Sequence, residues 1–188
     1  PKNNILKLNY KSKKINNNFL KILILPESFF SETLLLFEMI LKRCEYDNLN
    51  QYIFRLHPRM SIEELINIGN INFNLPKNLI ISRQTLENDI NSSDIAIYRG
   101  SASAIEASIS GIYPLYFNNN QDTSIDPLYS FFDDESNYFN DINNLDIYFE
   151  YYINEWHNNA ISKKLSLIAF CKEYFEQMNY LKIIKKLK

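Results

Sequence analysis

The sequence predicts an α/β fold, in which a parallel sheet is flanked by helices on both faces. Short, nearly all-apolar runs alternate with segments whose apolar residues recur at helical spacing. That alternation favours a parallel sheet with right-handed crossovers. The apolar runs lack an alternating polar face, as expected of strands covered on both sides. The 188 residues, 46% of them hydrophobic, suffice for one domain with a substantial core.

Five strands are expected from apolar runs bounded by turn residues. Pro26 ends the first run, and His57-Pro58 ends the second. The expected strands are 19–25, 52–56, 79–81, 94–98 and 113–117.

Five helices are expected between and after these strands. Ser31 can cap the first, and Ser61 with Glu64 forms a capping box for the second. The expected helices are 31–46, 61–69, 84–91, 103–110 and a long C-terminal helix from about 159. The polar residues 118–137 are expected to form a long loop, and 140–152 fit no single pattern.

The chain is divided into a Lys/Asn-rich tail or linker, 1–18, and one domain, 19–188. It begins at Pro1 instead of Met, which is compatible with a fragment of a longer protein and leaves that question open.

The most informative segment is the strand–turn–helix–strand of residues 94–117. Gly100 and Gly111, two of only three glycines, bracket its helix. Glycines this scarce are expected where a side chain is not tolerated. The turn brings together backbone N–H groups, the hydroxyls of Ser101 and Ser103 and a helix N-terminus, an arrangement that suits a phosphate.

Two interpretations of Ser103 and Glu106 stand side by side. As a capping box, the Ser103 hydroxyl and the Glu106 carboxylate would bond only to backbone N–H groups. As a ligand site, Ser101 and Ser103 would hold a phosphate, and Glu106, one turn into the helix, would accept hydrogen bonds from a ribose diol.

Polar residues follow each of the first four expected strands. In open parallel sheets, ligands bind beyond the carboxyl ends of the strands. His57, beside Arg59, is therefore expected to contact an anion, whereas His157 is expected to be structural. We expect His57, Arg99, Ser101 and Ser103 to converge on neighbouring strand ends. The polar residues at these ends are Glu27, Ser28, His57, Arg59, Ser82, Arg83, Arg99, Gly100, Ser101 and Ser103.

Composition and missing motifs exclude several classes of function. The net charge of −2 provides no basic field to attract nucleic acid. The sequence contains no GxGxxG, P-loop or GxSxG motif, and its two histidines lie far apart, so no metal site is expected. Cys44 and Cys171 are expected to be reduced core thiols of a cytoplasmic protein. The basic and apolar segment 181–188 fits either contact with an anionic membrane surface or a helix C-terminus.

Taken together, these motifs resemble a family. Arg55-x-His57-Pro58 after a strand, with Asp94, Gly100-Ser101-x-Ser103 and Glu106-Ala107 further on, looks like the C-terminal nucleotide-sugar-binding lobe of GT-B glycosyltransferases. It is most similar to the bacterial capsule and surface-polysaccharide enzymes, including sialyltransferases and Kdo transferases that use CMP-sugars. The resemblance covers about residues 19–117.

The resemblance implies a Rossmann-like lobe and roles for several residues. His57 would lie near the donor phosphate and stabilise the leaving group, Ser101 and Ser103 would hold the phosphate, and Glu106 would lie near the nucleotide. The donor would be a CMP- or UDP-sugar with no further cofactor, and the acceptor a glycan or lipid-linked glycan at the inner face of the membrane. The family has an N-terminal acceptor lobe for which this chain has no room, so the chain alone is expected to be inactive.

Two other functions stay open. One is a sugar-nucleotide epimerase of the same fold, and the other is a non-catalytic interaction module in which the turn at 99–106 only caps a helix. The sequence identifies no catalytic base.

Overall fold

The computed structural model describes residues 19–71, 74–119, 125–132, 136–158 and 160–175. The tail expected at 1–18 and the basic segment 181–188 lie outside the described residues.

The sheet has six strands, all parallel, in the order β3-β2-β1-β4-β5-β6. The predicted parallel α/β fold is thereby confirmed. A short sixth strand, which the sequence pattern did not indicate, follows the expected loop. The strands are β1 Lys21–Leu25, β2 Gln51–Phe54, β3 Leu79–Ile81, β4 Ile95–Tyr98, β5 Tyr113–Phe117 and β6 Tyr138–Phe139.

All five expected helices are present, and residues 142–156 add a further helical segment. It runs from a 3₁₀ turn, Ile142–Asn144, through α5 into a π-helical turn, Tyr152–Trp156. The α-helices are α1 Phe30–Tyr46, α2 Ile62–Gly69, α3 Leu86–Ser92, α4 Ser103–Ile109, α5 Leu145–Tyr151 and α6 Ile161–Glu173.

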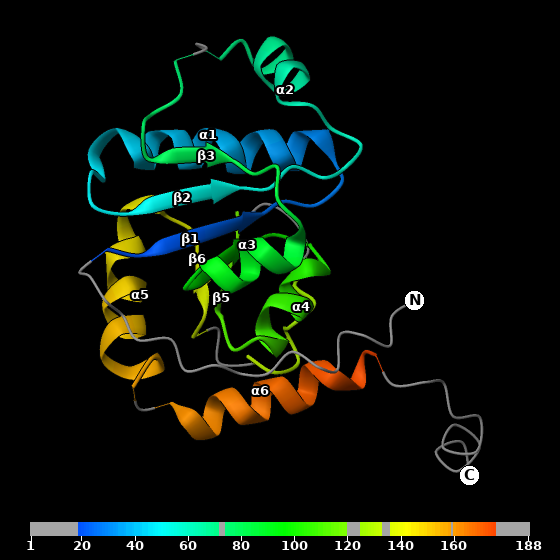
Figure 1. Cartoon of the computed structure of the whole chain (residues 1–188), viewed down its shortest axis with the longest axis vertical. Helices are drawn as coiled ribbons and strands as arrows, with labels where there is room; N and C mark the ends of the chain where they lie inside the picture. The colour runs from blue at the N-terminus through cyan, green and yellow to red at the C-terminus, as the bar shows by residue number, and fades with distance from the viewer. Residues whose placement is uncertain (1–18, 72–73, 120–124, 133–135, 159, 176–188) are drawn as a thin grey trace.

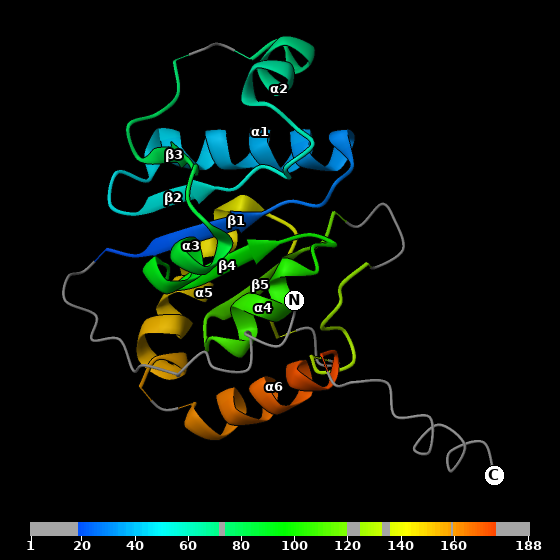
Figure 2. The same cartoon turned by 45° about the vertical axis from the view of Figure 1, so that its right-hand side comes forward.

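Helices cover both faces of the sheet (Figures 1 and 2). Helix α1 lies on one face, whereas α3 and α4 lie on the other. Helix α6 packs against α4 (Figure 2). The central strands β1 and β4 are buried almost throughout, which explains their lack of a polar face.

Arg43 joins α1 to β2 and α5 in a buried polar cluster. Its guanidinium pairs with Asp47 at 3.2 Å and with Asp146, and it lies over the Phe149 ring. The Tyr52 hydroxyl donates to Asp47 at 2.5 Å. Burial alone would raise the pKa of Asp47, but the hydrogen bonds from Tyr52 and Asn50 outweigh it and the pKa is lowered. The cluster fixes the end of α1 against the start of α5.

Two of the expected helix caps differ from the structure. Ser61 caps α2 as predicted, with its hydroxyl accepting the Glu64 N–H at 3.0 Å. Ser31 lies inside α1, whose N-cap is Phe29, and Ser103 is the first residue of α4, whose N-cap is Ala102. Neither N-cap makes a side-chain cap hydrogen bond. The chain enters α1 two residues earlier, and α4 one residue earlier, than the cap propensity of serine indicates.

Gly111 and the two cysteines occupy the positions expected of them. Gly111 follows α4 with φ +84°, and the N–H of Ile112 returns to the Ala107 carbonyl, which ends the helix in a left-handed turn. Cys44 and Cys171 are buried free thiols. Burial raises the pKa of each thiol to about 12.

Candidate functional site at the carboxyl edge between β1 and β4

The strand order places a topological switch point between β1 and β4. From β1 the chain moves outward through β2 to β3, then returns across the sheet to β4 and continues to β6. The loops that leave β1 and β4 therefore lead to helices on opposite faces, α1 and α4 (Figure 2). Open α/β sheets bind ligands in the crevice between such diverging loops.

Glu27, after β1, meets Gly100, after β4, at this point. Gly100 has φ +65°, a conformation that favours glycine. A Cβ added at Gly100 would lie 2.8 Å from Oε2 of Glu27 and 2.6 Å from Cδ1 of Ile125. The expectation that this glycine sits where no side chain is tolerated is confirmed, and the structure identifies the Glu27 carboxylate as one of the groups that would collide.

The surroundings of Glu27 shift the pKa of its carboxyl upward. Burial raises the pKa of Glu27, the neighbouring carboxylate of Glu32 raises it further, and Arg99 opposes them in part. The backbone of Glu27 is fixed by Thr33, whose hydroxyl donates to the Glu27 carbonyl at 3.0 Å.

Arg99 is a buried residue whose guanidinium faces protein groups. It pairs with Glu32 of α1, and its Nη1 donates to the Phe117 carbonyl at the end of β5 at 3.3 Å. Arg99 thus ties α1 to the carboxyl ends of β4 and β5. Glu32, which sequence reasoning did not single out, gives no sign of this role beyond its place in the first turn of α1.

Ser101, Ser103 and Glu106 lie together at the start of α4. All three are partly exposed, and Ala102 between the serines is exposed. The Ser101 carbonyl accepts the Ala104 N–H at 3.0 Å as the helix begins. The capping-box interpretation of Ser103 is wrong, because Ser103 is inside the helix and Ala102 holds the N-cap position.

His57 and Arg59 lie at the same edge but on the far side of β1. The expectation that the strand ends carrying His57 and Ser101 are neighbours is wrong, because β1 separates β2 from β4. Two strand spacings correspond to about 10 Å. The Nδ1 atom of His57 accepts the Arg59 N–H at 3.3 Å, so the neutral ring carries its proton on Nε2. The Arg59 side chain is exposed.

At the end of β3, Ser82 makes a structural hydrogen bond and is not a free polar group for a ligand. The Ser82 hydroxyl donates to Asp89 at 2.6 Å, and Arg55 donates to the same carboxylate at 2.7 Å. Arg83 is exposed. Sequence reasoning missed Asp89, which holds α3 against β2 and β3 and is buried because it is paired on both sides.

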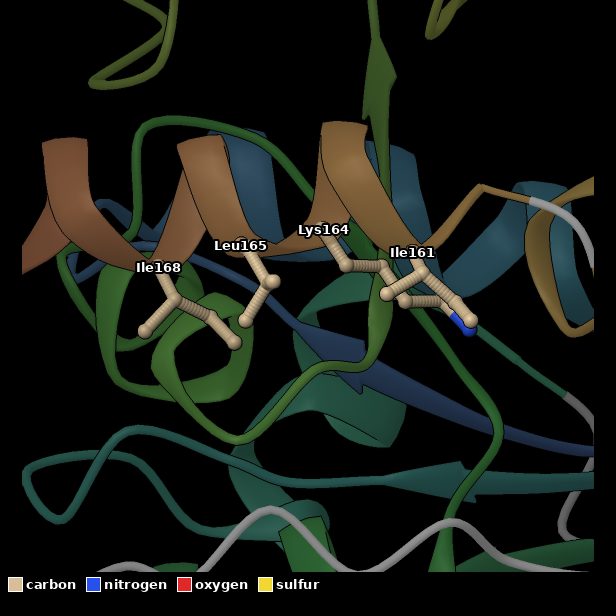
Figure 3. Close-up of a pocket in the computed structure, with 4 residues that line it drawn as sticks. All are labelled: Ile161, Lys164, Leu165 and Ile168. Atoms are coloured by element: carbon tan, nitrogen blue, oxygen red, sulfur yellow. The ribbon is translucent and has the colours of Figure 1, made fainter.

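Other parts of the described chain offer less for a site. A pocket lies along α6, lined by Ile161, Lys164, Leu165 and Ile168 (Figure 3), and it shares no residue with the carboxyl edge. Among the described residues, no three His, Cys, Asp or Glu side chains gather as they would around a metal ion. In the same ranges, no helix is both long and apolar enough to cross a bilayer.

Comparison with known proteins places the chain by its fold. No protein-family model and no curated protein matches the sequence. A solved glycotransferase of kitacinnamycin is similar in structure, with a TM-score of 0.55 and 12% identity, over 93% of this chain and 44% of that one. The catalytic domain of cholesterol-α-glucosyltransferase from Helicobacter pylori matches at a TM-score of 0.46 and 14% identity, over 82% of this chain and 98% of that domain.

The first of these similarities supports the predicted fold class, a Rossmann-like parallel sheet flanked by helices, with a C-terminal helix. The chain spans less than half the length of that structure.

Proposed function

We propose that this chain is the donor-binding lobe of a glycosyltransferase that transfers a sugar from a nucleotide-activated donor to a surface glycan. The observation that carries the proposal is the switch point between β1 and β4, where Gly100, Ser101 and Ser103 line the edge of a fold similar to that of a glycosyltransferase. Ligands of open parallel sheets bind at such an edge.

Different residues at this edge bind different parts of the donor. The backbone at Gly100 and the hydroxyls of Ser101 and Ser103 bind the donor phosphate. His57, through Nε2–H, and Arg59 approach it from the other side of β1. Hydrogen bonds and positive charge at this position stabilise the nucleotide leaving group as the glycosidic bond breaks.

Two further residues have supporting roles. Glu106, one turn into α4, lies near the nucleotide. Arg99, which is held by Glu32 and the Phe117 carbonyl, contributes mainly as a positioning residue for the β4–α4 turn.

Sugar transfer also needs an acceptor site, which the proposal does not assign to the donor-binding lobe. In the proposal, the acceptor, a glycan or lipid-linked glycan at the inner membrane face, binds a separate lobe that also carries the catalytic base. The 188-residue chain alone is then expected to bind nucleotide without turning over a CMP- or UDP-sugar.

Calorimetric titration of the chain with CMP, UDP and UDP-glucose tests the proposal, with inorganic sulfate as the control for non-specific anion binding. Saturable binding of a nucleotide, but not of sulfate, supports it. If no nucleotide binds, the proposal fails and the interaction module stands. Product analysis with the full-length protein then separates sugar transfer from epimerisation of the donor.

A further inference from the structure

The loop that leaves β1 at the switch point carries an acidic and an aromatic residue two positions apart in sequence. Glu27 and Phe29 both precede the first turn of α1. Phe29 is the N-cap of that helix, and its side chain is 66% exposed, the most exposed large apolar side chain in the described ranges. A phenyl ring in water at a ligand-binding edge is a surface on which a flat ring can stack.

Thr33, a buried residue of α1, makes two hydrogen bonds to the backbone of this loop. The side chain of Thr33 donates to the Glu27 carbonyl at 3.0 Å, and the Thr33 N–H donates to the Phe29 carbonyl at 3.0 Å. Thr33 itself is fully buried. The loop is therefore pre-organised, which lowers the entropic cost of binding a ligand there.

The Glu27 carboxylate retains capacity to accept hydrogen bonds. Across the part of the chain that the structure describes, its contacts are the Gly100 backbone and the fields of Glu32 and Arg99, with no side-chain hydrogen bond. Arg99 is engaged by Glu32 and by the Phe117 carbonyl. A ligand group that bonds to Glu27 must then be a hydrogen-bond donor, because the oxygens of an ionised carboxylate only accept hydrogen bonds.

We infer that the β1–α1 loop recognises the nucleoside of the donor: Glu27 accepts hydrogen bonds from the ribose hydroxyls, and Phe29 stacks on the base. This inference rests on the proposed function and extends it. It assigns ribose and base to a loop other than the β4–α4 turn that holds the phosphate. A nucleoside combines hydroxyl donors and a flat ring, which are the two features that this loop can bind.

The test compares CMP, dCMP and pyrophosphate by calorimetry on five variants of the chain. Glu27→Gln is expected to weaken CMP binding about tenfold, because a neutral amide with one oxygen replaces a charged acceptor with two, while dCMP binding changes much less. Phe29→Ala is expected to weaken CMP and dCMP alike, by about fivefold or more. Neither substitution is expected to weaken pyrophosphate binding.

Two substitutions elsewhere are matched controls. Glu38→Gln removes an exposed carboxylate from the middle of α1, and Leu49→Ala removes a side chain 62% exposed at the opposite edge of the sheet. Both are expected to leave all three affinities unchanged, and melting temperatures confirm that each variant is folded.

The outcomes separate the inference from the proposed function. If CMP binds and Glu27→Gln and Phe29→Ala leave its affinity unchanged, the inference is wrong and the donor-lobe proposal stands. The same holds if Glu106→Gln, and not Glu27→Gln, abolishes the preference for CMP over dCMP. If the unaltered chain binds no nucleotide, the proposed function itself falls.

Discussion

The Glu27 carboxylate packs against Gly100 so closely that a Cβ added at Gly100 would lie 2.8 Å from Oε2 of Glu27. The two residues belong to the loops that diverge at the switch point, and these loops approach each other closely there. Because Gly100 also has φ +65°, both the space and the backbone conformation call for glycine.

Gly100→Ala is expected to destabilise the fold and weaken nucleotide binding together. The left-handed backbone costs an alanine about 1–2 kcal/mol, and the added Cβ displaces Glu27 and Ile125. Denaturant unfolding and CMP titration of the same variant check this. Gly69→Ala, which meets only the flexible ends of Leu34 and Ile71, is the matched control and should retain nucleotide affinity. An unaltered affinity in Gly100→Ala would contradict the assigned site.

Ser101→Ala combined with Ser103→Ala is expected to weaken nucleotide binding about tenfold, since about 1.4 kcal/mol of lost hydrogen bonding is a factor of ten. Stability should change by less than about 0.5 kcal/mol, because neither serine is the N-cap of α4. Calorimetry and thermal melting of the double variant measure the two effects. A loss of stability with unchanged affinity would show that the serines serve the helix and not a ligand.

Arg43→Met is expected to destabilise the protein by about 3 kcal/mol, because it leaves the buried Asp47 without its cation. Asp146→Asn removes a partner whose side chain is 65% exposed, and should cost less than about 1 kcal/mol. Chemical denaturation of both variants gives the comparison. Equal losses would mean that the cluster is not organised around the Arg43–Asp47 pair.

The unaltered protein is expected to lose stability through Asp126 as the pH rises above about 4, the unfolded pKa of aspartate, and Asp126→Asn is expected to remove this loss. Burial raises the pKa of Asp126, and hydrogen bonds from Tyr98 and the Leu128 N–H offset this only in part. The folded state therefore binds the proton of Asp126 more tightly than the unfolded state. The contribution of Asp126 to stability is greatest below its unfolded pKa and decreases as the pH rises to its folded pKa.

Melting temperatures of the unaltered chain and of Asp126→Asn, measured between about pH 4 and pH 7, check this through their difference. Asparagine keeps an oxygen that can accept from Tyr98 but has no charge to lose. A difference that does not vary with pH would refute the assigned direction of the pKa shift.

Cys44 and Cys171 are expected to resist thiol reagents in the folded protein. Burial raises the pKa of both thiols to about 12, so almost no thiolate is present near neutral pH. Labelling with a disulfide reagent at about pH 8 should be slow for the native chain and should modify both cysteines after denaturation. Rapid modification of either one in the native state would show that it is not in the core.

The sequence by itself determined the strands and their parallel arrangement. Apolar runs such as Leu79–Ile81 and Tyr113–Phe117 match β3 and β5 residue for residue. The scarcity of glycine predicted that Gly100 and Gly111 lie where a side chain is not tolerated, and both have positive φ. These features depend on local chemistry: burial on both faces, backbone freedom and turn residues.

Only the tertiary structure decided which strands are adjacent and which side chains pair. Strand order depends on which crossover packs on which face, so the sequence did not place β1 between His57 and Ser101. Strand β6 has two residues, too few for a periodic pattern. The partner of Arg99 is Glu32, 67 residues away in the chain, and such pairs form only when separate loops meet. Residue types along the chain therefore indicated the edge where a site lies, whereas the fold determined which charges are already neutralised there.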